Sequence, residues 1–325
     1  MAGRTRGNAE IVPPNQPFHA SILKAEVVAA AECIATLPAE HRVIWDGTAG
    51  LGGHAIALHQ AYPQAKMLAS DADAEMLALI EKQANADRII LRQGNFAENP
   101  FSDFSPFGFV LLDLGISSAH FDHFERGFSF RFDQPLDMRL DTTQGKPAAE
   151  LLKSLSEEDL STMFFQYGEE RQARRIARMI CEQRKIAPIE RTGELAEICA
   201  RAYPPRHKAK GHAQKNPATR VFQALRIAVN GELDNLRHAL ATLPQALAIG
   251  GRLAIITFHS LEDRMVKLSF RERSQVAQND PAARSNFLPG DYRLIEPGGI
   301  TPTDEEIAVN SRARSARLRI LERVK

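Results

Sequence analysis

The 325-residue chain has the composition of an ordinary globular protein, with 44% hydrophobic and 25% charged residues. Its 41 basic and 40 acidic residues leave a net charge of +1. This balance excludes a uniformly basic nucleic-acid binder but not a local basic patch. No apolar stretch approaches the roughly 20 residues of a membrane span. The three cysteines form no CxxC pair. We therefore expect a cytoplasmic protein of about two domains with no membrane partner.

The first 113 residues predict a tail followed by a parallel sheet. Residues 1–17 are polar and proline-rich, and we expect a flexible tail there. Short apolar runs then alternate with amphipathic segments, and this βαβα rhythm predicts a parallel sheet with helices on both faces. The predicted strands are Val43–Asp46, Lys66–Asp71, Ile89–Gln93 and Phe109–Asp113, with helices over Gly53–Gln60 and Ala74–Ala84.

A glycine-rich turn follows the first predicted strand. It reads Asp46-Gly-Thr-Ala-Gly-Leu-Gly-Gly53 and leads directly into a predicted helix, which brings a ligand against bare backbone. Asp71 ends the second strand, where a carboxylate is placed to hold a ribose diol. Ligands of such sheets bind beyond the carboxyl ends of the strands, so we expect Asp46, Asp71, Gly94–Phe96 and Asp113 to line one crevice.

Two cofactors fit these residues. Gly50-x-Gly52-x-x-Ala55 with Asp71 matches a dinucleotide fingerprint, whose glycines admit a pyrophosphate. S-adenosylmethionine has no phosphate but carries an ammonium group, and an acid at Asp46 suits it. The dinucleotide pattern does not require that acid. These residues alone favour the methyl donor and leave the dinucleotide open.

The middle of the chain predicts a helical insert. Residues 119–150 are loop-like and rich in phenylalanine, and the pattern from Ala148 to Ala202 is purely helical. The sheet resumes after a long helix over Ala218–Leu243, with strands at Arg252–Thr257 and Ala316–Leu321. We therefore predict a sheet domain over 18–118 and 216–325 and an inserted domain over 119–215.

Positive charge is concentrated in this insert. A predicted helix, Glu169–Arg184, carries Arg171, Arg174, Arg175 and Arg178, and the segment 201–220 holds six Lys or Arg residues and no acid. A solvated charged face is the simplest explanation for one such helix. Two basic elements in a chain of near-zero net charge favour contact with phosphates, and hence RNA.

Several longer motifs resemble those of one family, the ribosomal RNA small subunit methyltransferase H group. They are Asp46–His54, Asp113–Ser118, Arg126–Phe130, Pro135–Arg139, Tyr167–Arg171, Asn216–Arg226 and Phe258–Arg264. The match runs from His19 to about Glu322, which is nearly the whole chain.

The resemblance implies an α/β class I (Rossmann-like) methyltransferase sheet with an inserted all-helical substrate domain. It implies S-adenosylmethionine as the cofactor, no metal, and methylation of the N4 amine of a cytidine in the decoding region of 16S rRNA, within an assembling or assembled small ribosomal subunit. Carried over by motif, the cofactor contacts are Gly52, Gly53, His54, Asp71, Phe96, Asp113 and His120; the family often has glutamine at the last position. The RNA contacts are expected at Arg139, Arg171, Arg174, Arg175, Arg178, Lys215 and Arg220. Phe128 and Phe130 are expected to be core residues of the loop rather than base-stacking platforms.

The candidates for proton transfer are Asp113 and His259. Many amino-methyltransferases place Asp/Asn-Pro-Pro-aromatic after the fourth strand, whereas this chain has Asp113-Leu-Gly-Ile116. Asp113 could therefore accept a hydrogen bond from the target amine or hold only the amino group of the donor, and we favour a position near both. His259 follows the fifth strand and either reaches the crevice or packs in the core. Two other functions stay open from sequence: an NAD-dependent oxidoreductase and a non-catalytic RNA-binding assembly factor.

Overall fold

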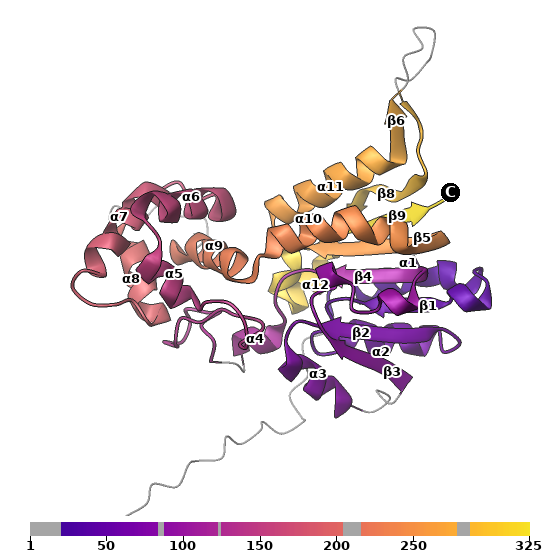
Figure 1. Cartoon of the computed structure of the whole chain (residues 1–325), viewed down its shortest axis with the longest axis horizontal. Coiled ribbons are helices and arrows are strands. Elements are labelled where there is room, and N and C mark those ends of the chain that lie inside the picture. The colour runs from indigo at the N-terminus through magenta and orange to yellow at the C-terminus, as the bar shows by residue number, and fades with distance from the viewer. Residues whose placement is uncertain (1–20, 84–87, 123–124, 204–215, 278–286) are drawn as a thin grey trace, which may run out of the picture.

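The computed structural model describes residues 21–83, 88–122, 125–203, 216–277 and 287–325. The predicted tail, residues 1–17, lies outside this part of the chain. The described residues form a sheet unit and a helical unit that lie side by side (Figure 1).

The sheet unit contains a seven-stranded, mostly parallel sheet. Its order is β3-β2-β1-β4-β5-β9-β8. The strands are β1 (Val43–Asp46), β2 (Lys66–Asp71), β3 (Ile89–Gln93), β4 (Phe107–Asp113), β5 (Leu247–Thr257), β8 (Tyr292–Ile300) and β9 (Arg317–Arg323). Only β9 runs against its neighbours, pairing antiparallel with both β5 and β8. The predicted class I methyltransferase sheet is therefore confirmed, and its strand order reverses between β1 and β4.

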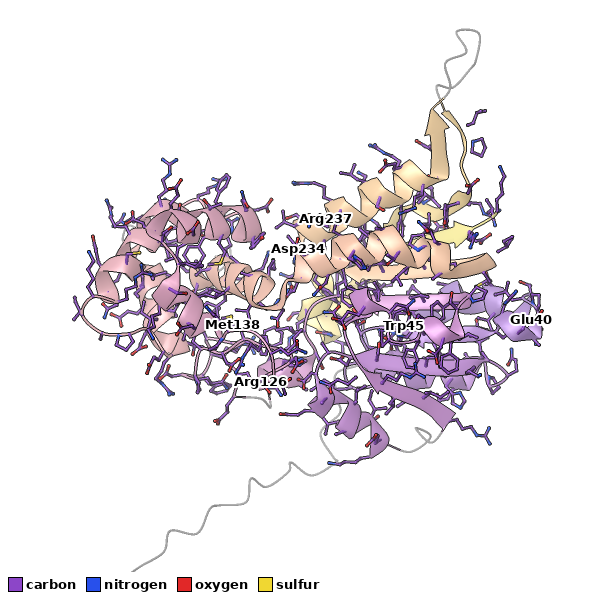
Figure 2. All side chains as sticks on the ribbon, in the orientation of Figure 1. Glu40, Trp45, Arg126, Met138, Asp234 and Arg237 are labelled. Carbon is purple, nitrogen blue, oxygen red and sulfur yellow. The ribbon has the colours of Figure 1, made fainter. Side chains whose placement is uncertain are left out.

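Successive residues of β1 serve two separate cores, because side chains of a strand alternate between the faces of the sheet. Ile44 packs on one face with α1 (Lys24–Ala30), α2 (Gly53–Ala61) and α3 (Ala74–Glu81). Trp45 packs on the other face with α10 (Glu232–Thr242) and α11 (Ser260–Ser274). Figure 2 shows Trp45 within the sheet unit. Strands buried on both faces read as continuous apolar runs, which is why the sequence located them.

The helical unit has its own core. It comprises α5 (Ala148–Ser154), α6 (Glu157–Gly168), α7 (Ala173–Gln183), α8 (Thr192–Arg201) and α9 (Ala218–Asn230), joined to β4 through α4 (Ser118–Asp122). Phe164, Ile176 and Leu195 are completely buried in it. Val221 and Leu225 of α9 belong to the same core, so the helical packing continues beyond residue 215, where the sequence placed the end of the insert.

Two helix predictions were wrong in extent. The helix expected from Glu169 begins at Ala173, because Glu169 adopts a left-handed conformation with φ of 49° and ends α6. The long helix expected over 218–243 divides into α9 and α10 at Gly231, whose φ is +60°. This turn sends α9 into the helical unit and α10 onto the sheet.

The remaining elements lie after β5 and were not predicted. They are α11, β8, α12 (Asp304–Val309) and a small antiparallel pair of β6 (Gln275–Ala277) with β7 (Phe287–Pro289). Short 3-10 helices include Phe96–Glu98 and Ser311–Ser315. No described helix is both long enough and apolar enough to cross a membrane.

Candidate active site

A cavity of about 700 Å³ lies at the carboxyl ends of the central strands. One wall is the glycine-rich turn after β1, with Asp71, Phe96 and Asp113 at the ends of the neighbouring segments. A second part of the lining comes from α9 and α10, and a third from residues within 115–121. The place is the one that the strand order predicts, because β1 and β4 are where connections diverge to the two faces of the sheet.

The glycine-rich turn is held by hydrogen bonds from the second strand. The Gly50 N–H donates to Asp71 Oδ2 at 2.8 Å, and the Ala49 N–H donates to the Ser70 carbonyl at 2.9 Å. Gly52 precedes α2 with φ of +79°, a conformation that favours glycine. Gly53 and His54 line the cavity, but Gly52 does not belong to its lining among the described residues. The role of Gly52 is thus in the turn.

Asp71 is an acceptor for the backbone as well as a cavity residue. Its Oδ2 accepts from Gly50 and its Oδ1 accepts from the Asp73 N–H at 2.9 Å. Burial raises the pKa of Asp71, while these N–H donors act in the opposite direction. Each oxygen retains a further lone pair, so the arrangement is compatible with a second partner inside the cavity.

Asp46, His54 and Asp113 form a polar cluster beside the cavity. His54 and Asp113 line the cavity, whereas Asp46, which the sequence predicted there, is not among the described lining residues. The His54 Nε2 lies 3.4 Å from Asp113 Oδ2. Asp46 Oδ1 accepts from the Thr48 N–H at 3.2 Å. The other oxygens, Asp46 Oδ2 and Asp113 Oδ1, are buried and make no hydrogen bond within the described residues. Buried polar atoms are rarely left this way, and the cluster is therefore suited to a polar ligand group.

Burial dominates the electrostatics of this cluster. It raises the pKa of Asp46 to about 7, although the charge of His54 and the Thr48 N–H act to lower it. For His54, burial acts to lower the pKa, but the interaction with Asp113 and the charge of Asp46 outweigh it and leave the pKa raised. The cluster therefore holds a proton near neutral pH.

His120 and Arg126 meet on Asp73 beside the cavity. His120 Nε2 lies 3.0 Å and Arg126 Nη1 2.7 Å from Asp73 Oδ2. Arg126 also pairs with Glu75 at 2.8 Å. Burial acts to raise the pKa of Asp73, but the bonds from His120 and Arg126 leave it lowered. His120 lines the cavity, as expected, and its ring nitrogen Nε2 is directed to Asp73.

The phenylalanines separate into cavity and core residues. Phe96 lines the cavity at the end of β3. Phe128 is buried against His120, with ring centroids 5.3 Å apart, and Phe130 packs on Phe222 at 5.0 Å. The prediction that Phe128 and Phe130 are core residues is thus confirmed.

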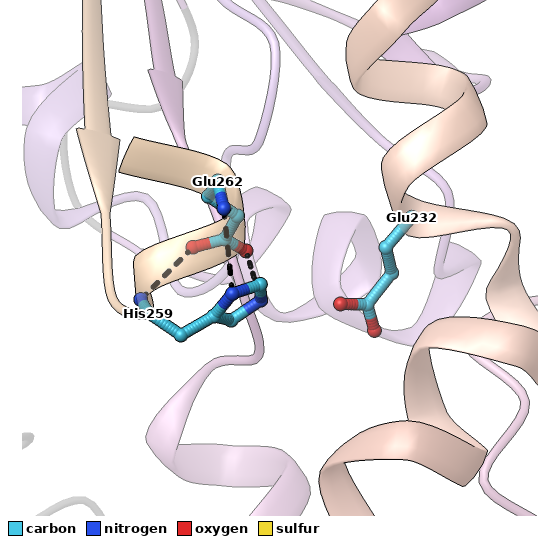
Figure 3. A group of neighbouring side chains, drawn as sticks. All are labelled: Glu232, His259 and Glu262. Atoms are coloured by element: carbon cyan, nitrogen blue, oxygen red, sulfur yellow. Dashed lines mark hydrogen bonds and ion pairs between the residues drawn. The ribbon is translucent and has the colours of Figure 1, made fainter. Parts of the chain in front are cut away.

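His259 caps its own helix. Its Nδ1 accepts from the Glu262 N–H at 3.4 Å, and its Nε2 lies 3.0 Å from Glu262 Oε1 (Figure 3). Glu262 Oε2 in turn accepts from the Phe258 N–H at 2.8 Å. Among the described residues, His259 is not part of the cavity lining, whereas Phe258 and Glu262 are. Of the two positions left open by the sequence, the geometry favours the packed one.

Glu232 faces His259 and Glu262 across a short gap (Figure 3). One ligand atom from each of the three residues lies within 4.8 Å of the others. All three already have partners, because Glu232 makes a double ion pair with Arg226 at 2.7 and 2.8 Å. These contacts account for the group without a metal. The sequence missed Arg226, Glu232 and Glu262. Arg226 and Glu232 meet only because the chain bends at Gly231, and Glu262 reaches the same cavity from α11.

The expected RNA contacts have different surroundings. Arg174, Arg175 and Arg178 are exposed on α7, and Arg171 is exposed in the turn before it. Arg220 is exposed on α9 and donates to the Glu169 carbonyl at 3.1 Å. Arg139 is bound by Asp137 at 2.8 Å and by the Thr142 carbonyl at 2.9 Å, which gives it a structural role in its loop. Lys215 lies outside the described residues.

Comparison with known proteins identifies the family of this chain. Residues 16–324 match the model of the MraW methylase family. The chain belongs to that family. A protein of Syntrophotalea carbinolica named ribosomal RNA small subunit methyltransferase H is 43% identical over 316 residues, covering 94% of this chain and 98% of that protein. Proteins of the same name from Treponema denticola and Chromohalobacter salexigens are 40% and 44% identical, covering 95% and 94% of this chain and 98% and 92% of their own lengths.

Among solved structures, an O-methyltransferase family 2 protein from Planctomyces limnophilus is only distantly similar. It is 13% identical with a TM-score of 0.31, covering 93% of this chain and 61% of that chain. This likeness is too remote to bear on function. Membership in the MraW methylase family, in contrast, makes the cavity the candidate methyl-transfer site.

Proposed function

We propose that this methylase uses S-adenosylmethionine to methylate the N4 amine of a cytidine in the decoding region of 16S rRNA, within an assembling or assembled small subunit. The observation that carries the proposal is the cavity itself. It combines a glycine-rich turn with His54, Asp71 and Asp113 at the edge where the strand order reverses. The names of the relatives, which cover more than nine-tenths of the chain, supply the class of substrate.

The residues present fit the proposed cofactor. Asp46 Oδ2 is buried with no hydrogen-bond partner among the described residues, and it suits an ammonium group or a water molecule bound to one. The first N–H groups of α2, at Gly53 and His54, suit the carboxylate of an amino acid. We assign Asp71 to the ribose and Phe96 to the adenine, and the presence of both residues in the cavity lining supports this. A nicotinamide dinucleotide has no ammonium group to match the acids, so the cavity favours the methyl donor.

When bound, S-adenosylmethionine supplies an activated methyl group on a sulfonium. Methylation forms one C–N bond, breaks one S–C bond and releases one proton from N4. The lone pair of that amine is conjugated with the ring, so an acceptor that holds its N–H bonds improves the nucleophile. Asp113 is the acceptor that we assign, because it ends β4 at the cavity and one of its oxygens is unsatisfied among the described residues.

Asp113→Asn tests that assignment. We expect a loss of about 100-fold or more in turnover with cofactor affinity nearly retained, because the amide cannot take a proton. Single-turnover kinetics and calorimetry separate the two effects. An equal loss of cofactor affinity and turnover indicates instead that Asp113 holds the donor.

Two measurements test the function as a whole. Calorimetric titration with S-adenosylmethionine, S-adenosylhomocysteine and NAD identifies the cofactor, and tight NAD binding without a response to the methyl donor supports the oxidoreductase alternative. Mass spectrometry of 16S rRNA from cells with and without the gene identifies the product. We expect the loss of one N4-methylcytidine. An unchanged methylation profile supports a non-catalytic assembly factor.

A further inference from the structure

One part of the cavity lining comes from two helices that meet at Gly231. Thr219, Arg226 and Asn230 of α9 belong to it, followed by Glu232 and Asn235 of α10. The positive φ of Gly231 turns the chain there. As a result Arg226, at the end of one helix, meets Glu232, at the start of the next.

Hydrogen bonds to Glu232 fix the Arg226 side chain and use only some of its N–H donors. Its Nε and Nη2 donate to the two oxygens of Glu232 at 2.7 and 2.8 Å. Both side chains are mostly buried, with 15% and 14% exposed. Within the described residues Nη1 donates no hydrogen bond, although Arg226 lines the cavity. A buried ion pair is a poor way to join two helices for stability alone, since apolar side chains of similar volume do as well or better.

Asn230 shows what a purely structural polar residue looks like in this part of the lining. Its Oδ1 accepts from the Leu140 N–H at 2.8 Å, and its Nδ2 donates to the Met138 carbonyl at 2.8 Å. Its amide is thus occupied in holding the loop at residues 138–140. Arg226, in contrast, combines a rigid orientation with unused N–H groups.

We propose that Arg226, oriented by Glu232, donates hydrogen bonds to N3 and O2 of the target base and thereby selects cytosine. This inference rests on the proposed function. A guanidinium only donates hydrogen bonds. In cytosine both N3 and O2 are acceptors, whereas in uracil N3 carries a hydrogen. Arg226 can therefore donate to both N3 and O2 of cytosine. When uracil enters, an N–H of Arg226 faces the N3–H of the base, and two donors meet without an acceptor.

The contact also orients the reacting amine. N3 is bonded to C4, which carries the N4 amine. Two hydrogen bonds, to N3 and O2, therefore fix the orientation of the base and the direction in which its amine points. Glu232 prevents the guanidinium from rotating, because its two oxygens accept hydrogen bonds from two of the three guanidinium nitrogens. Arg226 is thus assigned as a specificity residue that contacts the substrate.

The test uses a decoding-region RNA carrying one of three nucleosides at the methylated position. These are cytidine, uridine, and a 2-pyrimidinone ribonucleoside, which keeps the N3 and O2 acceptors but lacks the amine. Affinity is measured with S-adenosylhomocysteine present, and methyl transfer is measured with cytidine. The proteins are the wild type, Arg226→Gln, Arg226→Lys and, as a control, Arg237→Gln. Arg237 lies on α10 near Asp234 and is 67% exposed (Figure 2).

We expect the wild type to bind cytidine and 2-pyrimidinone RNA alike, and uridine RNA about tenfold or more weakly. Arg226→Gln removes this preference and lowers kcat/KM for cytidine by about 10- to 100-fold. Arg226→Lys keeps the positive charge opposite Glu232 but loses the paired N–H donors of the guanidinium, and it retains part of the preference for cytidine over uridine. Arg237→Gln behaves as the wild type.

The outcomes separate this inference from the function on which it rests. A wild type that transfers no methyl group to the cytidine RNA removes the proposed function. A wild type that does so, together with Arg226 variants that bind S-adenosylhomocysteine normally and keep both the preference and kcat/KM, overturns the role of Arg226 alone. Arg226→Lys decides the question if Arg226→Gln fails to fold.

Discussion

Two carboxyl groups in and beside the cavity are unfavourable for stability as long as no ligand binds them. Asp46 Oδ2 and Asp113 Oδ1 are buried with no hydrogen bond from the described residues. Unsatisfied buried acceptors destabilise a folded protein by roughly 1–3 kcal/mol each. A ligand that donates to them removes this penalty, so the folded state gains stability on binding beyond what contact area alone provides.

Asp46→Asn should stabilise the ligand-free protein, increasingly so as pH rises. Burial raises the pKa of Asp46 to about 7. Between the ordinary carboxyl pKa of about 4 and this value, the folded state binds a proton that the unfolded state has released. Stability contributed by this group therefore falls as pH rises to about 7, and stays low above it. The asparagine keeps an acceptor for Thr48 and carries no charge.

Thermal unfolding of both proteins over this range of pH measures the difference. The gap in Tm should widen from about pH 4 to pH 7 and then stay constant. A variant that is less stable than the wild type at about pH 8 contradicts the raised pKa of Asp46.

Asp71→Ala should weaken binding of S-adenosylmethionine by about 1.5–3 kcal/mol, because it removes charge-assisted hydrogen bonds to the ribose. Part of the loss comes from the turn, since Asp71 also accepts from Gly50 and Asp73. Asp103→Ala, at an exposed ion pair with Arg92, is the matched control. Unchanged affinity in a folded Asp71→Ala variant places the cofactor elsewhere.

The elements that the sequence predicted best are those whose environment is simplest. β1 and β4 are apolar on both faces, and their ends carry Asp46 and Asp113 as expected. β8 escaped prediction because it is a polar edge strand that contains Arg293, Glu296 and Pro297. The break at Gly231 also escaped, because a single glycine inside an amphipathic pattern does not by itself reveal a change of packing partner. Arg226 and Glu232 were missed for the same reason.

α7 is the element best suited to contact RNA. Ile176, Ala177 and Ile180 bury one face in the helical unit, which leaves Arg174, Arg175 and Arg178 on the exposed face. Changing these three arginines to glutamine should weaken RNA binding without altering cofactor affinity. Because each single-strand phosphate contact contributes about 0.7 to the log–log salt slope, the slope should flatten by about 2 if all three are lost.

A matched triple variant controls for the loss of three charges. Arg88, Arg237 and Arg271 are exposed on the sheet unit. Their replacement by glutamine should leave the salt slope nearly as it is. Equal slopes for the two triple variants show that α7 is an ordinary solvated helix face.

The whole molecule consists of two units joined by a buried ion pair as well as by the chain. Arg126, in the segment that leads into the helical unit, pairs with Asp73 at the start of α3 (Figure 2). Only 10% and 3% of these side chains are exposed. Asp73 in turn donates its N–H to Asp71. The orientation of the helical unit is thus linked, through two carboxylates, to the glycine-rich turn.

Arg126→Met should lower the free energy of unfolding by about 3–5 kcal/mol, because it leaves Asp73 charged and buried without its main partner. The double variant Arg126→Met/Asp73→Asn should recover part of this loss. Denaturant unfolding of the wild type, the single variants Arg126→Met and Asp73→Asn, and the double variant measures both effects. A double variant that is less stable than the sum of the two single changes argues against an uncompensated charge as the cause.

Both covalent connections between the units pass along the cavity. The outgoing segment contributes Gly115, Ile116 and Phe121 to its lining, and the returning segment contributes Arg226 and Asn230. The two units therefore cannot rotate against each other without changing the width of the space between these segments. If the helical unit docks onto a large, curved RNA surface and rotates to fit it, the cavity between these segments becomes wider or narrower. The volume of the cavity then depends on how well the RNA surface fits the helical unit. A match between the RNA and the helical unit, far from the cavity, would then also determine whether the target base can enter the cavity.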